Sequence, residues 1–125
     1  MTKGQELLFE RMDINLTLLV DKLNLKVGCC EEKLSRKVLG GYVGDLLSDV
    51  IANSKEGHVW ITRQSHQNII AVASLKEHAG IILALGKEPD RETLEKASSE
   101  GIPVMMSELS GFELSGRIYD LMSNY

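Results

Sequence analysis

The fold of this chain is decided by residues 58–86, HVWITRQSHQNIIAVASLKEHAGIILALG. The two ends of the stretch, His58–Thr62 and Gly80–Gly86, are apolar runs in which hydrophobic residues do not alternate with polar ones. Such runs are typical of strands that are covered on both faces, as in a parallel sheet. Because two parallel strands need a long connection, usually a helix, we predict a helix over residues 66–78 with Ser65 as its N-cap.

Residues 68–73, NIIAVA, also have the propensity of a strand, which is the alternative to this helix. A helix is favoured because it supplies the connection between the two strands. It would place Ile69, Val72 and Ala73 toward the core.

The same alternation continues downstream. Ile102–Met106 is a third apolar run and predicts a third strand. A helix before it opens near Pro89 and ends at Gly101, where glycine suits the left-handed residue after a helix. Ser110 and Glu113 fit the S/T-x-x-E capping box of a final helix, which we expect to continue to about residue 122.

Upstream, residues 45–51 have apolar pairs four residues apart, which indicates an amphipathic helix. Asn15 is placed to cap another helix at Leu16–Leu23, followed by a short strand near Leu25–Cys29. The order of these elements predicts an α/β fold: a single domain with a largely parallel β-sheet flanked by helices.

Size and composition narrow the class of protein. The chain has 125 residues, which suits one domain; we interpret residues 1–14 as an N-terminal extension and residues 15–125 as the α/β domain. The net charge of −4 and the lack of a block of basic residues argue against nucleic acid as a partner. The apolar runs are too short to cross a bilayer and the N-terminus does not look like a signal peptide, so we predict a cytoplasmic protein without a membrane partner.

The sequence contains no recognisable catalytic or metal-binding motif. Cys29 and Cys30 are adjacent, and two thiols are too few ligands for a zinc or iron–sulfur site, so we interpret them as small hydrophobic residues near a strand. The Gly86-Lys87 pair is not a P-loop, because Glu88 follows the lysine and the preceding residues read as strand. We therefore predict no catalytic residue, no metal and no cofactor.

Ligands of parallel α/β sheets bind where the carboxyl ends of strands meet the amino ends of helices. Residues 62–68, 86–87 and 107–108 each follow a predicted strand. Residues 40–45 would join them as a glycine-rich turn before a helix, provided that Lys37–Leu39 is a strand. The predicted ligand-binding residues, whose polar groups suit a nucleotide or an anion, are Gly40, Gly41, Thr62, His66, Asn68 and, as a weaker candidate, Ser107.

The residues of this chain resemble the DRTGG domain family from about Leu16 to Leu121. The segments that carry the resemblance are RKVLGGYVGDLLSDV (36–50), VWIT (59–62) with His66 and Asn68, AVA (71–73), GII (80–82), Pro89-Asp90 and GIP (101–103). The namesake motif is degraded, with Ser35-Arg36 in the place of Asp-Arg and Gly40-Gly41 as its glycine pair.

The resemblance implies a stand-alone domain with the α/β fold of the N-terminal domain of HPr kinase/phosphorylase. The P-loop kinase domain of that enzyme is not found in this sequence, so kinase activity is not implied. In other family members the domain looks like a regulatory or dimer-forming module.

Residues and resemblance together predict a non-enzymatic regulatory or accessory module. We expect a homodimer that senses a nucleotide or anion, or that docks a partner protein. Two alternatives stay open: a small enzyme in which His66 acts as general base with Asp45 or Glu108, and a purely structural dimerisation domain.

Overall fold

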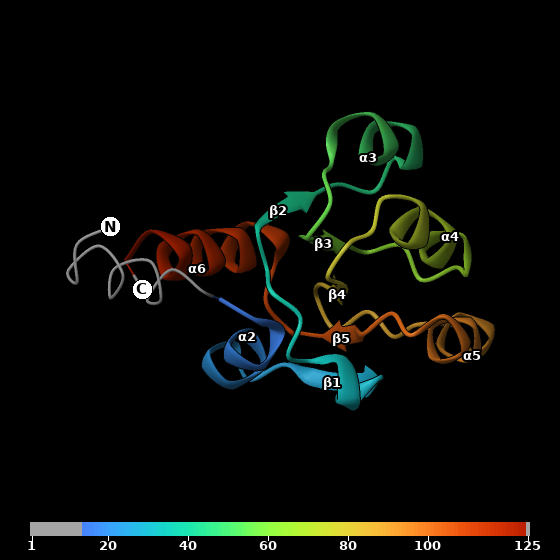
Figure 1. Ribbon diagram of the computed structural model, residues 1–125, viewed down its shortest axis with the longest axis horizontal. Coiled ribbons are helices and arrows are strands. Elements are labelled where there is room, and N and C mark those ends of the chain that lie inside the picture. Colours follow the sequence, from blue (N-terminus) through green and yellow to red (C-terminus); the bar gives the residue numbers. More distant parts are fainter. Residues whose placement is uncertain (1–13, 125) are drawn as a thin grey trace, which may run out of the picture.

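The computed structural model describes residues 14–124, and its centre is a five-stranded mixed sheet (Figure 1). The strands are β1 (Lys26–Cys29), β2 (Gly40–Val43), β3 (His58–Thr62), β4 (Gly80–Leu83) and β5 (Val104–Met106). Their order across the sheet is β1-β5-β4-β3-β2. Strands β2 to β5 are parallel and β1 runs antiparallel at one edge. The predicted fold class, an α/β domain with a largely parallel sheet, is confirmed.

Helices cover both faces of the sheet. One face carries α2 (Leu16–Leu23) and α6 (Gly111–Asn124), and the other carries α3 (Leu47–Asn53), α4 (Asn68–Leu75) and α5 (Arg91–Glu100) (Figure 1). A short 3-10 turn, η1 (Glu31–Lys33), follows β1. The central strands β3 and β4 are buried on both faces, which explains why their sequences are apolar throughout.

Several helix ends follow from their own residues. The side chain of Asn15 accepts a hydrogen bond of 2.9 Å from Leu18 N, so it caps α2 as predicted. Gly101 ends α5 with φ 69°, a conformation that glycine adopts without strain. Ser110 Oγ accepts from Glu113 N at 3.2 Å and caps α6.

The segment around Gly40 differs from its prediction. Lys37 forms an isolated β-bridge with Asn15 and is not part of a strand, and the strand is Gly40–Val43 instead of Lys37–Leu39. The glycine pair is therefore not a turn before a helix. A Cβ at Gly40 would lie 3.0 Å from the ring of His58, its partner in the neighbouring strand, so the position favours a residue without a side chain.

Two helix starts also differ from their predictions. Helix α3 begins at Leu47, so Asp45 precedes it and does not lie in its first turn. Helix α4 begins at Asn68 and ends at Leu75, and Ser65 is not its N-cap. The carbonyl of Ser65 instead accepts hydrogen bonds from Asp90 N and from Thr93 Oγ1 at the start of α5. Contacts with a segment distant in the sequence thus replace the capping role predicted for Ser65.

The predicted N-terminal extension, residues 1–14, lies outside the described residues except for Ile14. Ile14 is buried, and its carbonyl accepts a hydrogen bond of 2.7 Å from Val38 N. No helix within residues 14–124 combines the length and the apolar character needed to cross a membrane.

Candidate functional site

The carboxyl edge of the parallel strands is organised by Asp45, which follows β2. One oxygen of its carboxylate, Oδ1, accepts hydrogen bonds from Thr62 Oγ1 at 2.7 Å and from Arg63 N at 2.8 Å. The backbone carbonyl of Asp45 accepts from Gln64 Nε2 at 3.1 Å. The loop after β2 is thus tied to the loop after β3 by charge-assisted hydrogen bonds.

Thr62 is the buried residue of this cluster, with 2% of its surface exposed. Its hydroxyl donates to Asp45 and accepts from Gln64 N at 3.2 Å. Because the hydroxyl has one hydrogen, it has no further donor to offer while Asp45 holds it. A ligand that needs the Thr62 donor therefore has to compete with an internal carboxylate.

A hollow of about 210 Å³ lies beside this cluster. Its lining residues are Val43, Gly44, Asp45, Ile61, Thr62, Arg63, Ala84 and Gly111. The residue Arg63 is exposed, and Gly111 is the first residue of α6. The hollow thus combines a guanidinium, a carboxylate and the amino end of a helix. The guanidinium and the helix end suit an anionic group of a ligand, and the carboxylate suits a positively charged group beside it.

The predicted ligand-binding residues are only partly brought together. Thr62 lies in the hollow at the carboxyl edge, and Ser107 lies after β5 in a separate depression of about 110 Å³. The hydroxyl of Ser107 accepts from Leu109 N at 3.0 Å and so serves its own loop. Gly40 and Gly41 lie in the first half of β2, paired with His58 and Val59, and therefore away from this edge.

His66 and Asn68 lie at the start of α4 and are exposed. The ring nitrogen Nδ1 of His66 accepts a hydrogen bond of 3.1 Å from Asn68 N, so His66 takes part in the local turn that precedes the helix. Sequence reasoning did not select Arg63, although it lines the hollow. Its position directly after a predicted strand was the available signal.

The small-enzyme alternative finds no assembled dyad among the described residues. Asp45 is bonded to Thr62 and Arg63, and His66 is bonded to Asn68. Glu108 packs near Gly86, where an added Cβ would lie 2.7 Å from Glu108 Oε2. No hydrogen bond joins His66 to either carboxylate within residues 14–124.

The two cysteines are held as thiols beside α5 and its following loop. Cys29 Sγ donates to Ile102 O at 3.4 Å and Cys30 Sγ donates to Ala97 O at 3.5 Å. Burial, together with the adjacent Cys29, raises the pKa of the Cys30 thiol to about 12, which makes it a poor nucleophile near neutral pH. Among residues 14–124, no group of three or more His, Cys, Asp or Glu side chains is arranged to hold a metal ion.

The amino edge of the sheet holds the other two histidines. His78 is 4% exposed, and its Nε2 lies 2.8 Å from Ser54 Oγ. Because the Ser54 hydroxyl donates to Val50 O, we assign Nε2 of His78 as the protonated nitrogen that donates to Ser54. Burial first, then the charges of His58 and Lys76, lower the pKa of His78 to about 4.

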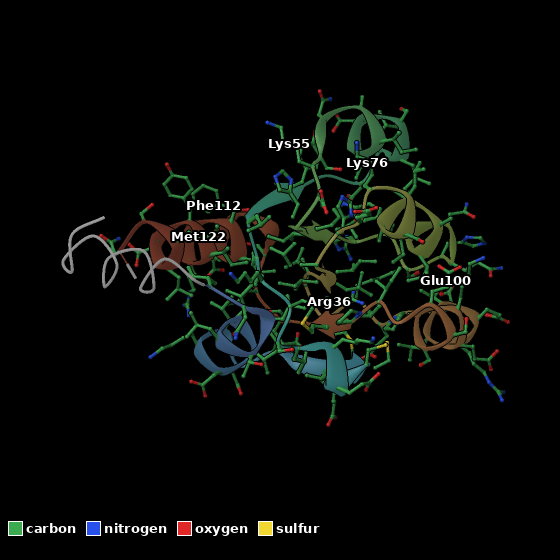
Figure 2. All side chains as sticks on the ribbon, viewed as in Figure 1. Arg36, Lys55, Lys76, Glu100, Phe112 and Met122 are labelled. Carbon is green, nitrogen blue, oxygen red and sulfur yellow. The ribbon has the colours of Figure 1, made fainter. Side chains whose placement is uncertain are left out.

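A larger cavity, of about 440 Å³, opens at this amino edge. Its charged or titratable lining residues are Arg36, Lys37, Glu56, Glu77, His78 and Glu100, of which Arg36 and Glu100 are labelled in Figure 2. Glu56 and Glu77 share a hydrogen bond that raises the pKa of Glu56. The lining mixes both signs of charge and so does not select one class of ligand.

No protein-family model matches the chain, and no curated protein matches it at a significant level. Among solved structures, the fold is similar to the crystal structure of the CBS and DRTGG domains of the regulatory region of Clostridium perfringens pyrophosphatase, in complex with the activator diadenosine tetraphosphate. The TM-score is 0.73 and the sequence identity is 19%. The match covers 90% of this chain and 48% of the other, so this chain spans about half the length of that regulatory region.

At this identity the likeness shows a shared fold, in agreement with the resemblance to the DRTGG domain at the level of the fold. The structural neighbour is a regulatory region and not a catalytic domain.

Proposed function

We propose that this chain is a non-enzymatic regulatory module of the cytoplasm that senses a small anionic ligand, a nucleotide or a simple anion, as a homodimer. The observation that carries the proposal is the shared fold with a regulatory region whose crystal structure contains a nucleotide activator. The hollow at the carboxyl edge is the proposed ligand site, with Thr62 and Arg63 in its lining. His66 and Asn68 do not line the hollow and stay candidates at the start of α4.

The size and chemistry of the hollow support an anionic group as the part that is recognised. Its volume of about 210 Å³ is below the roughly 300–1,000 Å³ of pockets that enclose a whole drug-sized ligand. A phosphate group fits such a volume, while a nucleoside would extend beyond it. Arg63 supplies the charge, since its guanidinium can bind phosphate oxygens with two parallel hydrogen bonds.

Asp45 gives the site a means of responding to a ligand. Its carboxylate holds Thr62 Oγ1 and Arg63 N, the donors that an anion would use. An incoming anion would displace this carboxylate and release the loop that joins β2 to α3. Ligand binding would then change the position of a surface segment, which is what a regulatory module requires.

A thermal-shift measurement of the full chain against adenine nucleotides and inorganic phosphate tests the proposal. We expect a ligand-dependent rise in melting temperature that is lost in Arg63→Gln and kept in Arg91→Gln. Arg91 is a matched control, because it is an exposed arginine on α5 that pairs with Glu95 and does not line the hollow. If no nucleotide or anion stabilises the chain, the sensing function is wrong and a structural dimerisation domain becomes the better account.

Docking of a partner protein is the second expectation from the sequence. We keep it as part of the proposal, because a loop that moves when a ligand binds regulates another protein only if that protein contacts the loop.

A further inference from the structure

Cys29 and Cys30 are the only cysteines of the chain, and their sulfur atoms lie 3.4 Å apart. In a strand, successive side chains point to opposite faces, so adjacent cysteines are ordinarily held apart. Cys29 is the last residue of β1, and Cys30 follows it in the left-handed conformation, with φ 65° and ψ 43°. Because the chain leaves the strand conformation at Cys30, the two thiols come together.

The backbone around the thiol pair is irregular in two ways. The left-handed conformation is uncommon for a residue that has a Cβ atom, and Cys30 adopts it. The register of β1 against β5 also shifts between Val27 and Cys29. Strained backbone conformations cluster at functional sites, so the pair of sulfur atoms at this point is a candidate for chemistry.

The two thiols differ in how easily a reagent reaches them. Cys30 is 8% exposed, whereas Cys29 is only partly buried. Cys29 Sγ donates to Ile102 O and Cys30 Sγ donates to Ala97 O, so both sulfur atoms lie against the end of α5 and the loop that follows it. A small reagent in solution therefore reaches Cys29 before Cys30.

We propose that Cys29 and Cys30 are a site of reversible oxidation, at which a small-molecule disulfide such as oxidised glutathione produces a disulfide bond between the two neighbours. In the first step, the Cys29 thiolate attacks one sulfur of the small disulfide, forms a mixed disulfide with it and releases the other half as a thiolate. In the second step, the Cys30 thiolate attacks Cys29 Sγ and releases the second half. The two cysteines lose two protons and two electrons, and the small disulfide is reduced to two thiols.

The closeness of the two sulfur atoms favours the second step. Burial, and then the neighbouring Cys29, raises the pKa of the Cys30 thiol to about 12, so Cys30 reacts poorly with a reagent from solution. Its target in the second step is already 3.4 Å away, and a group held at contact distance reacts as if it were very concentrated. In the mixed disulfide Cys29 no longer ionises, so its electrostatic effect on Cys30 is also removed.

The geometry of sequence neighbours makes the product easy to reduce. Consecutive Cα atoms lie about 3.8 Å apart, whereas a disulfide usually joins Cα atoms that are about 4.4–6.8 Å apart. A bond between Cys29 and Cys30 is therefore strained, and strained disulfides are the labile ones that small thiols reduce. Such a bond suits the proposed cytoplasmic setting, where thiols are kept reduced and a disulfide forms only transiently.

The first test is intact-mass spectrometry of the full chain after incubation with oxidised glutathione at mildly alkaline pH. Because the chain has two cysteines, a monomer that has lost two hydrogen atoms and carries no glutathione contains the Cys29–Cys30 bond. We expect this species to predominate and to return to the dithiol with excess reduced glutathione. Attached glutathione, a disulfide-linked dimer or unreacted chain as the main product would overturn the proposal, and so would a bond that reduced glutathione leaves intact.

The second test uses single variants to check the order of the two steps. Cys30→Ser should accumulate the mixed disulfide at Cys29, because the thiol for the second step is missing. Cys29→Ser should react with oxidised glutathione at least about tenfold more slowly, because the remaining thiol is buried and its pKa is raised. Far-UV circular dichroism checks that both variants fold. Equal rates for the two variants would contradict the order of attack.

The third test asks whether the fold brings the two thiols together or whether their adjacency in the sequence is enough. In a fixed mixture of oxidised and reduced glutathione, the ratio of the Cys29–Cys30 disulfide to the mixed disulfide should be about tenfold higher in the folded chain than in urea. Equal ratios would overturn a site that the fold creates. None of these outcomes bears on ligand sensing, which the thermal shift with nucleotides and phosphate judges separately.

Discussion

The two edges of the parallel sheet use polar residues in opposite ways. At the carboxyl edge, Asp45, Thr62 and Arg63 form a hydrogen-bonded cluster beside an open hollow. At the amino edge, His78 and Ser54 are buried and bonded to each other under the helices. Trp60 links the two edges: its Nε1 donates to Gly44 O at 2.8 Å, and its ring lies edge-on to His78, with the ring centroids 5.7 Å apart.

From this difference we infer that the amino edge contributes to the stability of the domain and that the carboxyl edge is the place for ligand binding. A buried histidine that stays neutral contributes to the core and responds to pH through the stability of the whole domain. A surface cluster can exchange its hydrogen bonds with a ligand at little cost to the core. Four predictions test this separation, in order of decreasing effect on stability.

Trp60→Ala should give the largest loss, because it removes the link between the edges. Trp60 is fully buried, and truncation of a buried tryptophan costs about 3–5 kcal/mol. Urea denaturation should show this loss, while Trp60→Phe should recover part of it without the bond to Gly44. A loss below 1 kcal/mol for Trp60→Ala would contradict the link.

The amino edge should make stability depend on pH. The pKa of His78 falls from 6.5 to about 4 on folding, so the unfolded chain binds the proton more tightly. Stability is complete above pH 6.5 and is lost as the pH falls toward 4, by about 3 kcal/mol for this group. Urea denaturation at pH 7 and pH 4 should therefore show a larger acid loss in the wild type than in His78→Gln, and equal losses would refute the assignment.

Asp45→Ala should act at the carboxyl edge with a smaller effect. It leaves the buried Thr62 hydroxyl and Arg63 N without their acceptor, which costs about 1–3 kcal/mol. The same change should raise the affinity for inorganic phosphate, since the competing carboxylate is gone. Asp21→Ala, an exposed aspartate on α2, is the control and should change neither quantity.

Arg63→Gln should have the smallest effect on stability, within about 0.5 kcal/mol, because its side chain is exposed. It should nevertheless abolish the thermal shift produced by nucleotides or phosphate. Calorimetric titration of phosphate into both proteins checks the two expectations. Unchanged binding in Arg63→Gln would move the ligand site away from the hollow.

Much of the fold could be predicted because its signals are local. The apolar runs of β3, β4 and β5, the cap at Asn15, the left-handed Gly101 and the cap at Ser110 each depend on a few neighbouring residues. The site was less predictable. Thr62 was selected because it follows a strand, whereas the role of Asp45 depends on groups 17 and 18 residues away in the sequence.

The sequence by itself determined that apolar strands alternate with capped helices, because the signals for burial and for capping each depend on residues that are close together in the sequence. Only the tertiary structure decided that Gly40-Gly41 is an edge strand, since its ladder partners belong to β3, which supplies hydrogen bonds that a glycine pair alone cannot indicate. It also decided that Asp45 serves the neighbouring loop instead of helix α3. In both cases a long-range hydrogen-bond partner outweighed the local preference of the residue, and that partner exists only once the strands lie side by side.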